Sequence, residues 1–179
     1  MSRQSKFLSL VLRHKPEEIG IKLDREGWVD IEILLRHLKK AGRAITRSEL
    51  DTLVATSDKK RFTISQNGRR IRAAQGHSIE IDLGLAPQAP PAELYHGTAS
   101  ASLDDIFAHG LVPQRRRQVH LSPNPETAEK VGRRHGKPVV LRVETAQMHE
   151  DGHLFYRADN GVWLTDHVPA RYLGFGRLE

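Results

Sequence analysis

A proline-rich stretch near the middle of the chain limits how this sequence can fold. Residues 83–93 read LGLAPQAPPAE, with three prolines and no apolar periodicity, which is typical of a semi-rigid linker. We therefore expect two small domains, residues 1–84 and 93–179, joined by residues 85–92. A chain of 179 residues can bury roughly 70% of its unfolded surface, so it can be stable without covalent cross-links.

The composition excludes several classes of protein. The sequence has no cysteine, which rules out disulfides and thiolate metal sites and favours a reducing compartment. The longest apolar run, Phe7–Leu12, is too short for a signal peptide or for a span of the bilayer. We expect a soluble, cytoplasmic protein without a membrane partner, and nothing in the sequence suggests more than a monomer.

The excess positive charge is confined to one half of the chain. The net charge is +6, and residues 1–92 hold 17 Lys and Arg against 11 Asp and Glu, whereas residues 93–179 hold 11 of each. A basic lobe joined to a neutral one suggests that the first lobe meets a polyanion and the second does something else. Ordinary solvated side chains explain the same counts, so charge alone leaves both interpretations open.

The first lobe is predicted to begin with three helices. Apolar residues within 7–12 form one side of a helix that ends near Pro16. Asp30 is a favourable N-cap for a second helix over residues 31–41. The run Thr46–Glu49 is a capping box that opens a third helix.

A β-hairpin is predicted to follow these helices. The strand-like runs RFTIS and RIRAA flank Asn67-Gly68, and Asn-Gly between two alternating runs is a strong hairpin signal. Three helices and a hairpin in a basic lobe look like a winged helix, a common nucleic-acid module, although architecture alone proves no function.

The second lobe is predicted to be mostly strand. Its short strand candidates lie at LYHGT, QVHLS, PVVLRVET, HLFYRA and VWLT. Two helices interrupt them, one at LDDIFAHG with Ser102 as its N-cap and one at PETAEKVGRRHG. Strands with a few helices form an α+β domain, so we assign the chain to the α+β class.

One short motif matches a metal site but lacks its context. Residues 149–153 read HEDGH, which fits the zinc-protease pattern H-E-x-x-H. That chemistry needs both histidines on one face of a helix, whereas Gly152 lies inside the motif and strand-like LFY follows it. We therefore expect no helix across this segment and no metal site. Phosphate-binding and dinucleotide-binding glycine motifs are also absent from the sequence, so ATP hydrolysis and Rossmann-type hydride transfer are unsupported.

Arginine and histidine side chains stand out on otherwise apolar elements. Arg13 and His14 follow the first helical run, Arg61 opens the first hairpin strand, and Arg115–Arg117 precede the strand around His120. Each one alone is explained by helix C-capping or by a solvated strand end. Their significance depends on the segments in which they lie.

Several of these segments occur in a fixed order that covers nearly the whole chain. They are LSLVLRHKPEEIGIKLDREGWV, RFTIS with IRAAQGHSI, PPAELYHGT, VHLS, and DNGVWLT with VPARYL. In these motifs the chain resembles the RNA 2′-phosphotransferase family, which removes a 2′-phosphate from RNA with NAD as co-substrate and serves tRNA splicing in some organisms. The resemblance implies an N-terminal winged-helix-like RNA lobe, a C-terminal ADP-ribosyltransferase-like NAD lobe, and a tRNA-like RNA with a 2′-phosphate as the partner.

The resemblance also implies a reaction in two steps without a metal. The RNA 2′-phosphate first attacks the anomeric carbon of the nicotinamide ribose and displaces nicotinamide. The neighbouring 2″-hydroxyl then attacks the phosphorus, which releases RNA with a free 2′-hydroxyl and ADP-ribose 1″,2″-cyclic phosphate. The protein must supply the cations, and arginine suits this because its fork binds phosphate bidentately.

The family's catalytic Arg-His-Arg-Arg set carries over to four positions of this chain. These are Arg13, His14, Arg61 and Arg116. Before VHLS, Gln118 replaces the usual histidine. Three consecutive arginines therefore leave the fourth position open within Arg115–Arg117.

The resemblance places the NAD-binding residues in the second lobe. They are His96, Gly97, Thr98, Gly110, Leu111, His120, Leu121, Ser122 and Val162. Val162 stands where protein-modifying ADP-ribosyltransferases carry a glutamate, which argues against protein ADP-ribosylation. A plain helix C-cap explains Gly110 equally well.

Two other functions remain open from the sequence. One is an ADP-ribosyltransferase that acts on other nucleic-acid phosphates, such as terminal phosphates, without an efficient second step. The other is a basic winged-helix nucleic-acid-binding protein with an inactive second lobe. Binding of NAD would distinguish the two, and the natural RNA cannot be named from the sequence.

Overall fold

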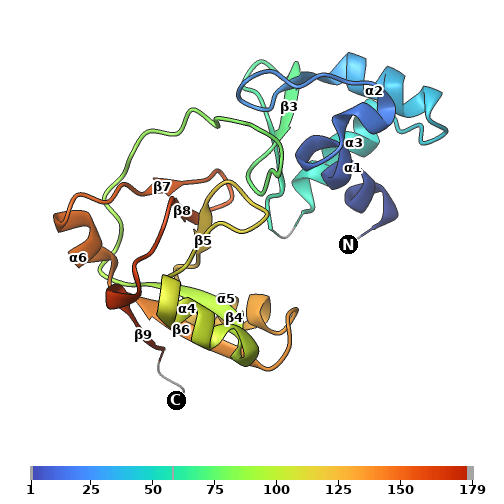
Figure 1. Cartoon of the computed structure of the whole chain (residues 1–179). Coiled ribbons are helices and arrows are strands. Elements are labelled where there is room, and N and C mark those ends of the chain that lie inside the picture. The colour runs from blue at the N-terminus through green and yellow to red at the C-terminus, as the bar shows by residue number, and fades with distance from the viewer. Residues whose placement is uncertain (1, 58, 177–179) are drawn as a thin grey trace. The chain divides into compact units, whose positions relative to one another are not determined.

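Two separate hydrophobic cores organise the chain. The computed structural model describes residues 2–57 and 59–176, and the chain divides into two units between Gly84 and Leu85 (Figure 1). Buried apolar residues between Leu8 and Ala73 form one core, and those between Leu94 and Tyr172 form another. Each unit therefore has a core of its own.

The three predicted helices of the first unit are present. They are α1 (Arg3–Arg13), α2 (Ile31–Lys40) and α3 (Arg47–Ala55). α1 begins before its apolar run because the Ser2 hydroxyl caps it by accepting a hydrogen bond from the Ser5 N–H. The Asp30 carboxylate caps α2 through two backbone N–H groups, and the predicted capping box opens α3.

A short antiparallel sheet completes the first unit. It consists of β1 (Val29–Asp30), β2 (Phe62–Ile64) and β3 (Arg70–Ala73) in the order β1-β3-β2. β2 and β3 form the predicted hairpin, in which Phe62 pairs with Ala73 and Ile64 with Ile71. Gly68 has φ +71° in the connecting turn, which explains the glycine there. A 3₁₀ helix, η1 (Pro16–Ile19), follows α1.

The second unit contains two small antiparallel sheets. One has the order β4-β6-β9 and the other β5-β8-β7. Their strands are β4 (Leu94–Ala99), β5 (Val119–Leu121), β6 (Pro138–Val143), β7 (Tyr156–Arg157), β8 (Trp163–Thr165) and β9 (Leu173–Phe175). A bridge between Tyr95 and Ser122 joins the two sheets. Small antiparallel sheets combined with helices confirm the α+β class.

The helices of the second unit correct two details of the sequence analysis. They are α4 (Leu103–His109), α5 (Pro125–Gly132) and α6 (Thr145–Glu150), with 3₁₀ helices η2 (Ser100–Ser102) and η3 (Ala170–Tyr172). Ser102 occupies the N-cap position of α4, but its side chain makes no capping bond because its backbone is already helical. α6 was not expected, since it is short and Glu144 provides no side-chain cap for it.

The proline-rich stretch has no helix or strand between residues 85 and 92, yet its backbone is held. The Gln88 N–H donates to the Phe155 carbonyl at 2.8 Å, and the Thr145 hydroxyl donates to the Pro91 carbonyl at 2.6 Å. Residues from Leu85 onward belong to the second unit. This segment is therefore packed against the unit that follows it in the chain.

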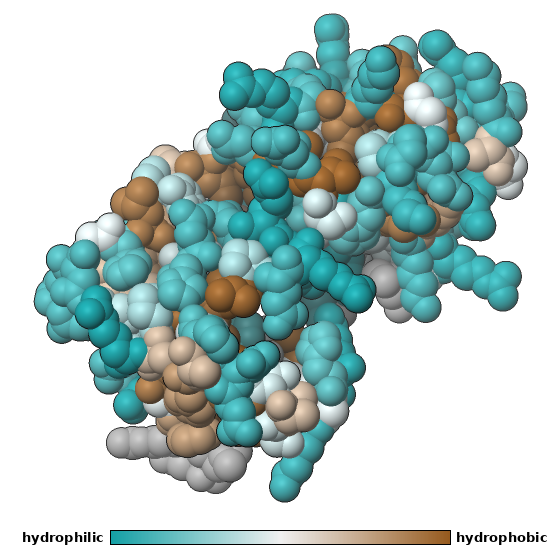
Figure 2. Space-filling model, viewed as in Figure 1, coloured by the Kyte–Doolittle hydropathy of each residue, from teal (hydrophilic) through white to brown (hydrophobic). Residues whose placement is uncertain are grey.

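On the face drawn in Figure 2, hydrophilic side chains predominate, and apolar ones form smaller groups among them. The exposed large apolar residues of the described chain are Ile33, Phe107, Val112, Leu154 and Phe175. Within residues 2–57 and 59–176, no helix has the length and apolar character that crossing a membrane requires.

Candidate functional site

In the first unit, residues 74–78 tie together the predicted catalytic positions Arg13, His14 and Arg61. The Ala74 N–H donates to the Arg61 carbonyl at 2.9 Å, and the Ser78 N–H donates to the Arg13 carbonyl at 3.0 Å. The His14 Nδ1 and the Ser78 hydroxyl oxygen lie 2.8 Å apart in a hydrogen bond. The segment therefore links the end of α1 to the start of β2.

These three residues differ in backbone setting and in exposure. α1 ends at Arg13, and His14 is its C-cap residue, with φ −130° and ψ −44°. His14 is exposed, whereas Arg13 and Arg61 are partly buried. Gly76 has φ +90°, and a Cβ on it would lie 3.6 Å from the guanidinium carbon of Arg13. The backbone of the segment thus passes directly beside the Arg13 side chain.

Sequence reasoning assigned no role to Gly76, His77 or Ser78. All three lie at the end of IRAAQGHSI, after the residues predicted as the second hairpin strand, and have no helix or strand signal of their own. Their position beside Arg13 and His14 depends on tertiary pairing with α1. The sequence signal that could have identified them is a glycine and a histidine directly after a predicted strand of the basic lobe.

His77 is a buried histidine surrounded by cations. Its side chain belongs to a residue that is only 4% exposed. Burial, followed by the positive charges of Arg13, Arg72 and His14 in that order, lowers the pKa of His77 from 6.5 to about 4. The imidazole is therefore neutral at physiological pH. A neutral ring here avoids adding another positive charge between Arg13 and Arg72.

The chemistry available in the first unit suits an anion. Two guanidinium groups provide planar forks that match phosphate oxygens. His14 has an imidazole held at one nitrogen by Ser78, and histidine is the side chain best placed to exchange a proton near neutral pH. The cluster therefore has the components of a phosphate site.

In the second unit, β4 and β5 bring two predicted NAD-binding histidines together. The Nδ1 of His96 lies 3.1 Å from the His120 carbonyl oxygen. Because a carbonyl only accepts, the His96 Nδ1 carries the proton, which leaves its Nε2 as an acceptor in the neutral ring. Burial is the largest effect on His96 and lowers its pKa, so the neutral form is favoured.

Arg116 lies in the same part of the second unit. A terminal guanidinium nitrogen of Arg116 hydrogen-bonds to the Nδ1 of His120. Since a guanidinium only donates, this nitrogen of His120 is an acceptor. Partial burial lowers the pKa of Arg116, and the nearby charge of Arg134 acts in the same direction. Arg116, the arginine that the resemblance places in the catalytic set, therefore contacts a predicted NAD-binding histidine.

Gly97 has a structural reason to be glycine. A Cβ on Gly97 would lie 1.6 Å from the carbonyl oxygen of Ala128 in α5. From the other side, a Cβ on Gly132 would lie 2.7 Å from the carbonyl oxygen of Thr98. Both glycines therefore let β4 and α5 approach backbone to backbone, and Thr98 is buried at this contact.

The remaining predicted NAD-binding residues differ in accessibility. Leu111 and Leu121 are buried in the core of the second unit, so only their backbones could contact a ligand. Gly110 is the C-cap of α4, and Leu111 pairs with Val168 through backbone hydrogen bonds in both directions. Ser122 pairs in the same way with Tyr95, and Val162 is partly buried just before β8.

The HEDGH segment does not form the helical zinc motif. α6 includes His149 and Glu150, so part of the motif is helical, contrary to the expectation from sequence. Gly152 then has φ +96° and the helix ends before His153. The two histidines therefore do not share a helical face. In the described residues, no three His, Asp or Glu side chains are grouped so that they could hold a metal.

The sequence is similar to known proteins along most of its length. The family described as "RNA 2′-phosphotransferase, Tpt1 / KptA family" matches residues 1–167. A protein of Agrobacterium fabrum named "Probable RNA 2′-phosphotransferase" is 57% identical over 169 residues, which cover 94% of this chain and 91% of that protein. Proteins with the same name from Pseudomonas aeruginosa UCBPP-PA14 and Streptomyces coelicolor are each 55% identical, over 94% and 96% of this chain and 93% of each relative.

Proposed function

The chain belongs to the RNA 2′-phosphotransferase family, and on that premise we propose that it transfers an internal 2′-phosphate from RNA to NAD. The observation that carries the proposal is the cluster in the basic first unit. There residues 74–78 hold Arg13, His14 and Arg61 together. Guanidinium forks beside an exposed imidazole suit a phosphate dianion better than a neutral substrate.

The proposed reaction has two steps that conserve atoms and charge. In the first, an oxygen of the RNA 2′-phosphate forms a bond to the anomeric carbon of the nicotinamide ribose, and nicotinamide leaves with the electron pair of the broken C–N bond. In the second, the ribose 2″-hydroxyl attacks the phosphorus, and the RNA 2′-oxygen leaves and takes up a proton. The products are 2′-hydroxyl RNA and ADP-ribose 1″,2″-cyclic phosphate.

The residues have separate proposed roles. Arg13, Arg61 and Arg116 would neutralise the phosphate and stabilise the charge that develops during its transfer. His14 would donate or relay a proton, or hold the phosphate. Ser78 supports His14 by the hydrogen bond to its Nδ1, which fixes the orientation of the ring.

The second unit is the proposed NAD site. Its donor set fits a dinucleotide, because imidazole and hydroxyl groups can bind ribose and amide. The proposed NAD-binding side chains are His96, His120 and Ser122, with backbone and partly buried positions at Gly97, Thr98, Gly110, Leu111, Leu121 and Val162. Gly97 would act there through its backbone groups, because α5 occupies the position that a Cβ on this residue would take.

We propose that the first unit binds RNA and that the second unit binds NAD. Three helices and a three-stranded antiparallel sheet support a winged-helix-like RNA-binding first unit. The paired β4 and β5 support an ADP-ribosyltransferase-like second unit. The proposed substrate is a tRNA-like RNA with a 2′-phosphate, handled by a cytoplasmic monomer that needs no metal.

A direct assay tests the function. The protein is incubated with NAD and a short RNA that bears one internal 2′-phosphate, in the presence of EDTA, and the products are separated by chromatography. We expect nicotinamide, dephosphorylated RNA and ADP-ribose 1″,2″-cyclic phosphate. Nicotinamide with only ADP-ribosylated RNA would support an ADP-ribosyltransferase that lacks the second step. No consumption of NAD would support a nucleic-acid-binding protein.

Replacement of Arg61 tests the role of the clamp. Arg61→Ala is expected to slow the second step about 10- to 100-fold, because a charge-assisted hydrogen bond contributes about 1.5–3 kcal/mol. ADP-ribosylated RNA should then accumulate on a denaturing gel. Arg69→Ala is the matched control, since Arg69 is exposed on the hairpin turn and its backbone N–H, which bonds to Asn67, is retained. Loss of nicotinamide release without any intermediate would show that Arg61 has a different role.

A further inference from the structure

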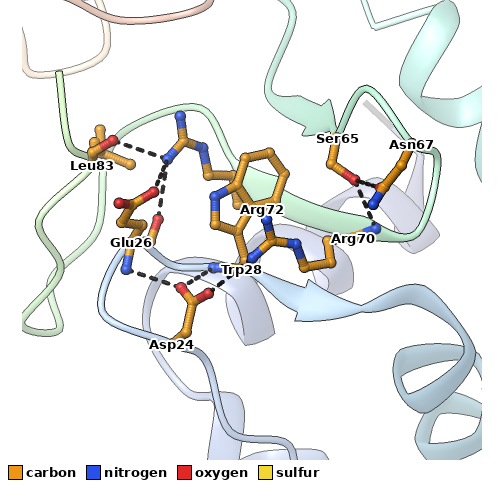
Figure 3. Close-up of polar contacts among 8 residues, drawn as sticks. All are labelled: Asp24, Glu26, Trp28, Ser65, Asn67, Arg70, Arg72 and Leu83. Atoms are coloured by element: carbon orange, nitrogen blue, oxygen red, sulfur yellow. Dashed lines mark hydrogen bonds and ion pairs between the residues drawn. The ribbon is translucent and has the colours of Figure 1, made fainter.

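Arg72 on β3 is a buried cation to which the proposed mechanism assigns no role. The residue is 7% exposed. One terminal nitrogen of its guanidinium donates to the Leu83 carbonyl at 3.0 Å and to the Glu26 carbonyl at 3.4 Å, and it lies 3.9 Å from the Glu26 carboxylate (Figure 3). The guanidinium carbon also lies 4.4 Å from the centre of the Trp28 ring. A single side chain thus connects three parts of the first unit.

The contact with Leu83 closes a loop. The chain leaves β3 at Ala73, passes through residues 74–78 beside Arg13 and His14, and returns to Arg72 at Leu83. A second bond, from the Asp82 N–H to the Arg25 carbonyl at 2.9 Å, holds the same end of the loop. We call residues 73–83 the phosphate loop. One end of this loop follows Arg72 directly in β3, and the other end is held by the Arg72 guanidinium.

The turn over residues 24–28, which Arg72 contacts, is held by hydrogen bonds of its own. One carboxylate oxygen of Asp24 accepts hydrogen bonds from the N–H groups of Glu26 and Trp28, each at 2.9 Å (Figure 3). Within this turn, a Cβ on Gly27 would lie 3.2 Å from the Nε2 of His77. The turn therefore packs against the middle of the phosphate loop, while Arg72 holds the end of that loop.

The chemistry of this position suits arginine and no other side chain. A buried charge is costly unless it is paired and hydrogen-bonded. Arg72 meets two carbonyls, a carboxylate and the face of an indole at once, which its planar, delocalised group allows. A lysine ammonium is a strongly hydrated point charge and would not satisfy the same set. The cost of burying this charge is explained if the Arg72 guanidinium holds the segments around it in a fixed arrangement.

We propose that Arg72 is a positioning residue for the transfer reaction. It closes the phosphate loop so that Ser78 meets the His14 ring and the loop backbone meets Arg13 and Arg61. It acts through the loop and does not contact the substrate. This inference rests on the proposed function, because it assigns the ordered loop a role in phosphate transfer.

The chain contains a matched control for Arg72. Arg70 lies on the same face of β3, two residues away, and its guanidinium carbon lies 5.3 Å from the centre of the same Trp28 ring. Its side chain is 48% exposed and pairs with Asp24 at 3.4 Å. Arg70→Met thus removes a cation from the same tryptophan without removing the Leu83 contact.

The experiment compares wild type with Arg72→Met, Arg72→Lys, Arg70→Met and Ser78→Ala. Three quantities are measured: the single-turnover rate at saturating RNA and NAD, the KM for NAD, and the NMR shift of the His14 Nδ1. Ser78→Ala gives the shift that results when the His14 bond is removed directly. Amide hydrogen exchange of residues 74–78 reports the order of the loop in each folded variant.

We expect Arg72→Met to lower the rate about tenfold, the loss of one charge-assisted contact, with the KM for NAD unchanged. Its His14 shift should move toward that of Ser78→Ala, and its loop amides should exchange faster. Arg72→Lys should recover part of the rate, and Arg70→Met should stay within about twofold of wild type. General destabilisation would not move the His14 shift of the folded protein, so this signal separates positioning from stability.

Two results would overturn the inference, and they are distinguishable. If wild type transfers the 2′-phosphate but folded Arg72→Met and Arg72→Lys keep the wild-type rate or the wild-type His14 shift, Arg72 has no positioning role. If wild type consumes no NAD with this RNA, the proposed function fails and the role of Arg72 fails with it. Should Arg72→Met not fold, the rate and shift of Arg72→Lys decide between these outcomes.

Discussion

Gly97→Ala is expected to destabilise the second unit by about 4 kcal/mol or more and to abolish the proposed binding of NAD. The added methyl would lie 1.6 Å from the Ala128 carbonyl oxygen and 2.9 Å from the Gly132 nitrogen. These atoms are backbone, so no side-chain rotation relieves the overlap, and β4 must separate from α5. Overpacking in a core costs about 1–3 kcal/mol when side chains can adjust, and values above that mark a fixed backbone.

Thermal unfolding of the purified variants measures this effect. Gly152→Ala is the control in the same unit, because a Cβ there meets nothing within 4 Å and only the backbone conformation at φ +96° is unfavourable. We expect Gly152→Ala to cost about 1 kcal/mol. A melting temperature of Gly97→Ala equal to that of Gly152→Ala would show that α5 moves away from β4 without penalty.

Gly97 also shows how a family resemblance can leave out part of the reason for a residue. The sequence analysis placed it in the NAD site on the strength of a family resemblance. The structure gives it a packing role that holds whether or not NAD binds, because α5 occupies the space beside its Cα. The contact between β4 and α5 joins residues about 30 positions apart in the sequence, and no local pattern predicts such an approach. His96, beside it on β4, is then fixed by the same packing.

Local signals predicted most of the first unit. Asp30, the capping box at Thr46 and the Asn67-Gly68 turn each act within a few residues, and the structure has all three. Short elements without such signals were missed. α6 spans Thr145–Glu150 without a side-chain N-cap, and β9 is three residues long at the edge of a sheet. Packing against the rest of the second unit stabilises both.

The sequence singles out the charged residues of the candidate site but not the segment that holds them in place. Arg13, His14 and Arg61 stand out because charged side chains interrupt apolar runs. Residues 74–78 carry ordinary loop composition, and their role follows from hydrogen bonds to α1 and to the start of β2. Arg72 alternates with apolar neighbours on β3 and reads as the solvent face of a hairpin, yet the chain from 77 to 84 returns over it. Such a contact between separate segments produces no periodic pattern in the sequence from which it could be predicted.

Acidification is expected to destabilise the first unit through His77. The pKa of His77 is 6.5 in an unfolded chain and about 4 in the folded protein, because burial and the charges of Arg13 and His14 on α1 and of Arg72 on β3 oppose protonation. Above pH 6.5 neither state binds the proton, and the stabilisation is complete. Between pH 6.5 and 4 only the unfolded state binds it, so stability is lost as the pH falls. The full loss is about 3 kcal/mol.

Urea unfolding between pH 7 and pH 4 tests this, with His77→Gln and His109→Gln as a pair. His77→Gln removes the titrating group, so its stability should fall less steeply with acid than that of wild type. The side chain of His109 is 74% exposed, and His109→Gln should keep the wild-type slope. In NMR spectra the ring protons of His77 should not titrate above pH 5, because the folded state excludes the proton there. A His77 midpoint near pH 6.5 would contradict the prediction, since it would mean that water reaches the ring and that the cations around it are screened. A neutral His77 at pH 7 leaves the neighbouring positive charges to Arg13 and Arg72.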